Sequence, residues 1–150
     1  VRCHMQAIQT LKELRENPYQ DMDIDTDCIV SFELIERDKL RRYIENPYLY
    51  SRVQHSENMQ LEQRGITIVK SDLPAELLKE QIIWEKKNNN RYITFLMKEE
   101  ITEGFPNDLQ RQLQMIQQKY QTGAVISRFL VCAQEEGKIY DFYKTFVEII

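Results

Sequence analysis

Four aspartates at alternate positions form the densest group of chemically capable side chains in the sequence. Asp21, Asp23, Asp25 and Asp27 could offer oxygen ligands to a hard cation such as Ca²⁺ or Mg²⁺. The glycine and glutamate that a calcium-binding EF-hand loop requires are missing at the expected positions. The group therefore predicts either a metal site, used by a small cation-dependent enzyme, or a solvated acidic loop, and the acidic loop is the simpler interpretation.

Basic residues form two short groups that could contact the phosphates of a nucleic acid. In the second group, Tyr92 could add a platform on which a base stacks. Acidic neighbours offset the first group, and charge is spread evenly over the two halves of the chain, so nucleic-acid binding is an alternative hypothesis. The residues are Arg37, Lys39, Arg41 and Arg42, followed by Lys86, Lys87 and Arg91.

Residues suited to nucleophilic or acid–base catalysis are sparse. His55 is the only histidine beyond residue 4, and Cys28 and Cys132 lie among apolar neighbours, where a cysteine usually packs as a small core residue. The sequence has no glycine-rich phosphate loop, serine nucleophile elbow or zinc-binding histidine motif. We therefore expect a non-catalytic protein without a cofactor.

An uncharged polar stripe lies on the helix expected over residues 107–121. Solvent-facing helices usually carry lysine and glutamate, whereas amides can be buried at a contact at a lower cost than charges. The stripe therefore predicts the flank of a protein–protein contact, with a merely solvated face as the alternative. Its members follow an i, i+4, i+7, i+11 spacing, next to an apolar stripe of the same spacing, and are Gln110, Gln114, Gln117 and Gln121.

Hydrophobic periodicity predicts the elements that must position these residues. Asn-Pro pairs end the first two helices, since a residue before proline resists helical geometry. Residues 48–63 fit a poorly packed helix or a long loop, which Gly65 ends. We expect helices at 5–16, 37–45, from Ser71 or Asp72 to about Lys87, and 107–121 with Gly123 as its C-terminal cap, and strands at 28–35, 66–70, 92–98, 124–134 and 139–148.

This element order predicts a single α+β domain over residues 5–150. We expect a mixed, mainly antiparallel five-stranded sheet with helices packed mostly on one face and a C-terminal β-hairpin. The last strand is apolar on both faces, so it must be interior or covered by a partner. We predict that its aromatic residues bind a protein partner or a second copy of the chain: Tyr140, Phe142, Tyr143 and Phe146.

Bulk composition sets the broad class. The chain has 150 residues, a net charge of −4 and three cysteines without metal or redox spacing. This indicates a reducing compartment, and we expect a cytoplasmic protein. No apolar run reaches the roughly 20 residues of a bilayer span, so no membrane association is expected. Residues 1–4 resemble a cloning remnant before a native start at Met5. The leading hypothesis is a regulatory or assembly module that self-associates.

Overall fold

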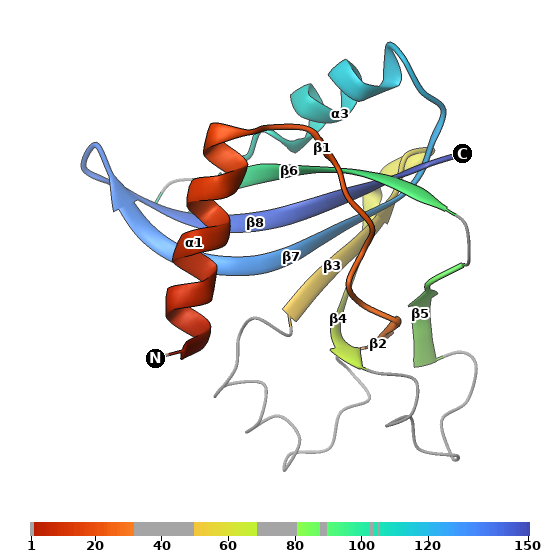
Figure 1. The fold of residues 1–150 in the computed structure, drawn as a ribbon, viewed down its shortest axis with the longest axis horizontal. Coiled ribbons are helices and arrows are strands. Elements are labelled where there is room, and N and C mark those ends of the chain that lie inside the picture. Colours follow the sequence, from red (N-terminus) through yellow and green to blue (C-terminus); the bar gives the residue numbers. More distant parts are fainter. Residues whose placement is uncertain (1, 32–49, 69–80, 88–89, 103, 105) are drawn as a thin grey trace.

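The computed structural model describes residues 2–31, 50–68, 81–87, 90–102, 104 and 106–150. Its elements are joined into one layered arrangement in which a long sheet carries a helix on each side (Figure 1). The helices and strands are α1 (Arg2–Glu16), β1 (Gln20–Asp21), β2 (Cys28–Ser31), β3 (Tyr50–His55), β4 (Asn58–Ile68), β5 (Ile82–Glu85), β6 (Arg91–Glu100), α3 (Leu109–Gln117), β7 (Thr122–Glu135) and β8 (Lys138–Ile149).

Within the described residues, the sheet has eight strands in the order β1-β6-β8-β7-β3-β4-β2-β5, and every pair is antiparallel. The predicted mixed sheet of five strands was therefore wrong. Strand β3 and the first part of β4 lie where the sequence predicted a helix or a long loop, and the strand predicted at 66–70 forms the end of β4 as far as the described residues reach. Strand β5 replaces the end of the helix predicted to reach Lys87. Pairing with neighbouring strands overrides the weak local preferences of these segments.

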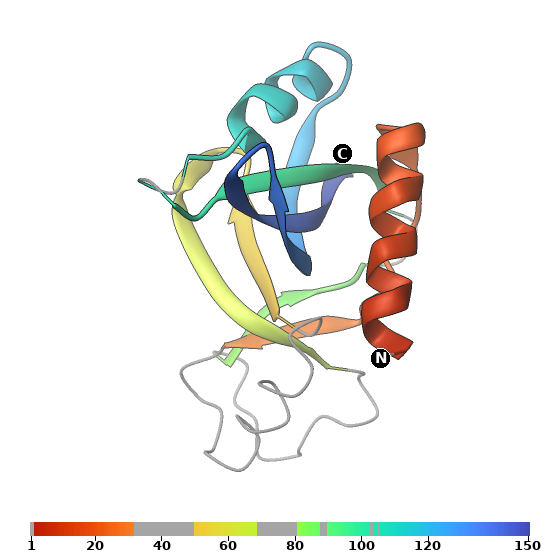
Figure 2. The same cartoon turned by 90° about the vertical axis from the view of Figure 1, so that its left-hand side faces the viewer.

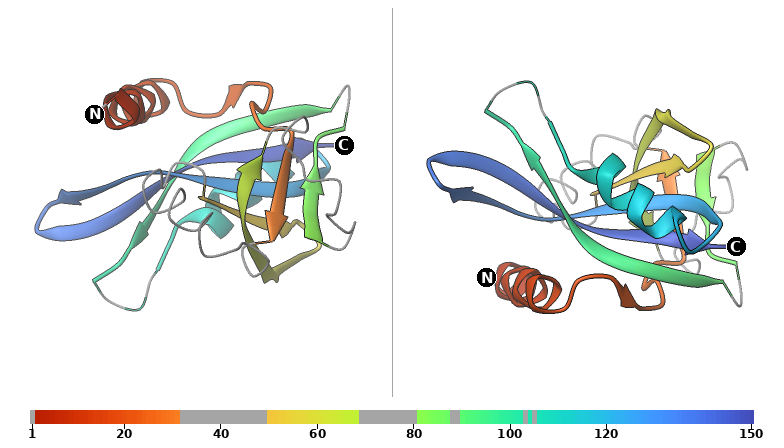
Figure 3. Two further views of the ribbon diagram at one scale, coloured as in Figure 1. Left: turned by 90° about the horizontal axis from the view of Figure 1, so that it is seen from below. Right: turned by 90° about the horizontal axis from the view of Figure 1, so that it is seen from above.

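The predicted placement of helices on one face was also wrong. Helix α1 packs through Ala7 and Leu14 against a cluster that includes Phe142. Helix α3 packs against a different cluster, which includes Tyr143. Successive residues of a strand point to opposite faces, so the two helices cover opposite sides of the sheet. Figures 2 and 3 show this separation, and we call the two sides the α1 side and the α3 side.

The sheet is strongly curled, as Figure 2 shows. Residues 22–27 connect β1, at one end of the sheet, to β2, near the other end. Within this connection Ile24 is buried and packs with Ile126 and Phe146 on the α1 side. The connection thus covers a second part of the same side, next to α1 (Figure 1).

The C-terminal β-hairpin was predicted correctly. Strands β7 and β8 pair from their far ends to the turn at Glu136 and Gly137, whose φ angles are 50° and 79°. Positive φ at both central residues is the geometry of the type I′ turns that suit hairpins. Strand β8 lies between β6 and β7, so its two apolar faces are explained by an interior position.

The remaining expectations have mixed outcomes. The helix at 5–16 and the strand at 92–98 are confirmed, and α3 is shorter than the predicted helix at 107–121. Gly123 lies inside β7 and caps no helix, and Gly65 lies inside β4, where a Cβ atom would collide with the carbonyl oxygen of Val30. The strand predicted from Cys28 begins there, whereas its end and the helix at 37–45 fall outside the described residues.

Candidate functional site

Helix α3 is fixed to the sheet by its apolar stripe. Leu109, Leu113 and Ile116 are buried against the cluster on the α3 side. At its start, the backbone N–H of Leu109 donates to Oδ1 of Asn107 at 3.1 Å. Asp108 occupies the cap position without capping the helix, and its Oδ1 accepts instead from the backbone N–H of Lys98 at 3.3 Å. The helix is therefore anchored to β6 at its first turn.

One glutamine of α3 is buried and protects the edge of the sheet. The side chain of Gln112 donates from Nε2 to the carbonyl oxygen of Leu96 at 3.0 Å and accepts at Oε1 from the Tyr19 hydroxyl at 3.1 Å. The backbone N–H of Glu100 donates to Pro106 at 3.0 Å, farther along the same edge of β6. Exposed strand edges invite pairing with other chains. The segment 106–112 therefore covers backbone groups through which another strand could pair.

The outward face of α3 is largely uncharged. Gln110, Gln114 and Gln117 are exposed there, together with Met115, whose surface is 46% exposed. We call these four residues the glutamine surface. Arg111 is the charged side chain within the helix, and its Nη2 lies 3.6 Å from Oδ2 of Asp108. Gln121, which was predicted to extend the stripe, is also exposed but lies beyond the end of the helix.

A buried ion pair lies beneath the start of α3. Arg52 on β3 donates from Nη1 and Nη2 to the two carboxylate oxygens of Glu99 on β6, at 2.6 and 2.8 Å. Its Nη2 also donates to the Tyr143 hydroxyl at 2.8 Å, and Asn107 donates to Glu99 at 3.2 Å. The guanidinium further lies 3.5 Å from Oε1 of Glu62. This network joins four strands (β3, β4, β6 and β8) to the segment that leads into α3.

A hollow of about 200 Å³ opens beside this network and reaches the glutamine surface. Both features share Gln110, so the hollow and the exposed helix face are continuous. Because Arg52 already donates to several acceptors, the floor of the hollow is a saturated polar network. The lining residues are Arg52, Gln54, Met59, Glu62, Asn107, Leu109 and Gln110.

The network makes the stability of the fold depend on pH. Burial raises the pKa of Glu99, but hydrogen bonds from Arg52 and its positive charge outweigh burial and hold that pKa below its ordinary value. The unfolded-state pKa is about 4.3. The stabilisation is therefore present above that value and is lost as the pH falls through the lower folded-state pKa. We expect the free energy of unfolding, measured with urea from about pH 6 to 3, to fall less steeply for Glu99→Gln than for the wild type. Equal slopes would contradict this role.

The aromatic residues predicted to bind a partner are mostly core residues. Phe142, Tyr143 and Phe146 are 1%, 2% and 0% exposed, respectively, and Tyr140 is half-buried. Strand β8 is apolar on both faces because it is an interior strand, with α1 on one side of the sheet and α3 on the other. The side chains of Phe142, Tyr143 and Phe146 therefore pack inside the chain and are not exposed to the partner that was predicted, whereas Tyr140 keeps part of its surface exposed.

The four aspartates do not converge on one point. Asp21 lies 2.5 Å from Nε of Arg91, Asp23 lies 2.9 Å from Nζ of Lys86, and Asp25 lies 2.6 Å from Nη1 of Arg128. Asp27 is partly buried at the start of β2. Within the described ranges, no three metal-ligating side chains gather as a cation site would require. The alternating spacing places each carboxylate beside a different part of the sheet.

The basic residues predicted to bind a nucleic acid do not form one group in the structure. Arg37, Lys39, Arg41 and Arg42 lie outside the described residues. Lys86 and Arg91 form ion pairs with Asp23 and Asp21, and Lys87 is exposed. Tyr92 is fully buried, so it cannot stack on a base, and burial raises the pKa of its hydroxyl to about 12.

Sequence reasoning did not identify Arg52 and Glu99. Glu99 follows Ile93, Phe95 and Met97 at intervals of two, and all four are buried. A carboxylate in phase with the apolar face of a strand is the signal that could have identified it. Arg52 gives no such signal, because its segment was not recognised as a strand.

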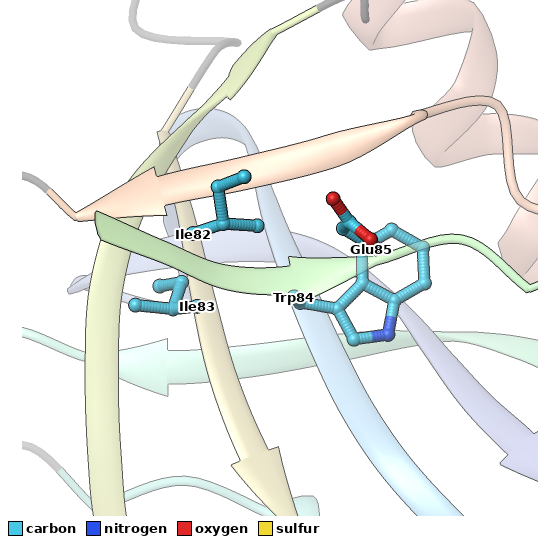
Figure 4. A pocket seen from close by; sticks show the side chains of 4 residues that line it. All are labelled: Ile82, Ile83, Trp84 and Glu85. Atoms are coloured by element: carbon cyan, nitrogen blue, oxygen red, sulfur yellow. The ribbon is translucent and has the colours of Figure 1, made fainter. Parts of the chain in front are cut away.

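A second hollow, of about 400 Å³, borders β5 and is lined by Ile82, Ile83, Trp84 and Glu85. Ile82 and Ile83 point to opposite sides of the strand (Figure 4). Ile83 and Trp84 pack against the buried cluster that contains Tyr92. Together with Glu85, these residues form a wall without converging polar groups, so it indicates no particular chemistry.

Comparison with known proteins gives no family for this chain. No family model matches the sequence, and no curated protein or solved structure is significantly similar to it. In the part of the chain that the structure describes, none of the helices has the length and apolar character needed to cross a bilayer.

Proposed function

We propose that the protein is a non-catalytic interaction module that self-associates through the glutamine surface. The observation that carries the proposal is the combination of an anchored helix and a largely uncharged outward face. The apolar side of α3 is buried, and the exposed surface of the helix presents Gln110, Gln114 and Gln117 on one flank and Met115 on the other, with Arg111 between them. A rigid helix that presents neutral side chains can be buried against a partner without leaving charges unpaired.

Two properties of this surface favour a second copy of the chain as the partner. In a two-fold contact the same patch faces itself, so charged residues would meet like charges. The four residues of the glutamine surface are uncharged, and the charge of the neighbouring Arg111 is partly balanced by Asp108, 3.6 Å away. Each glutamine amide both donates and accepts hydrogen bonds, so identical side chains can pair across the axis. Met115 adds an adaptable apolar contact. The hollow beside Gln110 gives the surface a concave part that a partner side chain can fill.

The catalytic alternatives receive less support from the geometry. The carboxylates proposed for a cation-dependent enzyme lie against Arg91, Lys86 and Arg128. The Arg52–Glu99 network is chemically rich, but its donors and acceptors are occupied by one another. These residues therefore position α3, through the contact of Glu99 with Asn107.

Light scattering coupled to size exclusion tests the proposal. We expect the wild type to be dimeric at about 100 µM and the double variant Gln114→Glu, Gln117→Glu to be monomeric, because four like charges would meet at the two-fold contact. The matched control is Gln60→Glu on the exposed part of β4, which should remain dimeric. A monomeric wild type, or a dimer that the double variant leaves intact, would contradict the proposal.

We propose the cytoplasm as the compartment. In support of this, Cys132 is an exposed free thiol, as is usual where thiols stay reduced. Cell fractionation tests the proposal, and recovery in an oxidising compartment would contradict it.

A further inference from the structure

Two basic residues lie side by side on the α1 side of the sheet. Arg128 on β7 is directly opposite Lys144 on β8 in the antiparallel register. They share this side with Phe142 and Phe146, which precede and follow Lys144 at intervals of two. Like charges at directly opposed positions repel one another and destabilise a sheet.

The pair lies in a seam between two coverings of the sheet. Helix α1 packs over Phe142, Leu130 and Val131. The connection at residues 22–27 packs, through Ile24, over Phe146 and Ile126. Lys144 and Arg128 occupy the row between these two contacts. Figure 1 shows α1 and the connection running beside each other over this part of the sheet.

Burial in the seam differs between the two cations and their acidic neighbours. Arg128 is 4% exposed and Lys144 is half-buried. The side chain of Asp25, which accepts from Arg128 at 2.6 Å, is 51% exposed. Glu13 on α1 is exposed. The positive charges therefore lie deeper than the negative charges at the rim.

The positive charge of Lys144 is balanced by fewer neighbouring groups than that of Arg128. Its Nζ lies 5.2 Å from the centroid of the Phe146 ring, and the described residues give it neither a hydrogen bond nor an ion pair. Burial lowers the pKa of Lys144, Asp25 partly offsets this effect, and Arg128 adds to it. An ammonium group carries three N–H donors, and leaving them without acceptors in a half-buried site is unfavourable.

We propose that this seam binds a small phosphate group, which Lys144 contacts directly and whose charge Arg128 balances. An oxyanion supplies acceptors to the ammonium group and relieves the repulsion between the two cations. The flanking α1 and residues 22–27 restrict the ligand to a small ion or a small phosphate ester. Asp25 and Glu13 at the rim disfavour larger polyanions by repulsion.

Inorganic phosphate is the probe that tests this site, with sodium chloride at equal ionic strength as the reference. Lys144→Met keeps an apolar stem of similar length. Its matched control is Lys98→Met, since Lys98 is on the same side of the sheet with Nζ 4.9 Å from the centroid of the Tyr140 ring. Phosphate also stabilises proteins non-specifically, so the comparison between variants isolates binding at the seam.

We expect phosphate to raise the melting temperature of the wild type and of Lys98→Met equally, and that of Lys144→Met less. Calorimetric titration should give one phosphate per chain and an affinity roughly tenfold or more weaker for Lys144→Met, because a charged hydrogen bond is lost. Equal phosphate effects in the wild type and in Lys144→Met would overturn the proposal.

A second measurement needs no variant. Phosphate should protect Lys144, but not Lys98, from acetylation by acetic anhydride, as quantified by mass spectrometry. Unchanged labelling of Lys144 at saturating phosphate would overturn the proposal. A parallel titration with glycerol 3-phosphate identifies the source: an affinity within about tenfold of phosphate indicates an ester ligand, and a weaker one indicates the free ion.

Discussion

Replacing Glu99 with leucine is expected to lower the free energy of unfolding by about 3–5 kcal/mol, because it leaves the Arg52 guanidinium buried without its main partner. The two side chains are only 7% and 10% exposed, so water cannot replace the lost carboxylate. Equilibrium urea unfolding measures the change. The loss should exceed that expected from the area of one carboxylate, because it includes the desolvation of the remaining charge.

A double-mutant cycle separates the ion pair from its surroundings. In Arg52→Met, Glu99→Leu both charges are absent, and we expect the double variant to recover most of the stability lost in Glu99→Leu. The control is Arg64→Met, whose side chain is 60% exposed and pairs with Glu62. It should cost only about 0–1 kcal/mol. Additive losses in the cycle would show that the two charges do not depend on each other.

Replacing Phe146 with alanine is expected to cost about 3–5 kcal/mol, the usual cost of removing a large aromatic side chain from a packed core. Phe146 is 0% exposed and belongs to the cluster that joins the sheet to Ile24 and Tyr92. The substitution would leave a cavity between β8 and the covering connection. Urea unfolding at neutral pH measures the loss.

The same variant distinguishes a core residue from a contact residue. The folded fraction of Phe146→Ala should keep the molar mass of the wild type, because its contact surface is elsewhere. Ile139→Ala, at a residue that is 39% exposed near the turn of the hairpin, should change stability by about 0.5 kcal/mol or less. A Phe146→Ala variant that is fully stable but dissociated would instead show that Phe146 contacts a partner.

The parts of the fold with strong local signals could be predicted from the sequence. The terminal hairpin follows from two alternating runs around the Glu136-Gly137 turn, and α1 follows from its periodic apolar residues and the Asn17-Pro18 end signal. Strand β3 and residues 58–65 of β4 could not be predicted in this way. Their turn, at Ser56 and Glu57, lacks a strong turn signal, and residues 58–64 of β4 are mostly polar and exposed. These strands depend on pairing with distant residues of β2 and β7.

The candidate site was predicted in part. Three of the four glutamines lie on the exposed face of α3, as the helical spacing indicated. The buried role of Gln112 could not be foreseen, because its acceptor, the carbonyl oxygen of Leu96, is on a strand edge that only the topology defines. The aromatic residues of β8 were assigned to a surface because their pattern is the same for an interior strand and for a strand covered by a partner.

The proposed contact joins two copies of the chain through the glutamine surface. Disulfide trapping tests it most directly, in a background where Cys3 and Cys132 are replaced by serine. A two-fold contact brings the same position of both copies together. Gln114→Cys is therefore expected to form a covalent dimer under mild oxidation, whereas Gln60→Cys, on the exposed part of β4, should not. Covalent dimers that form equally at both positions, or at neither, would contradict the claim.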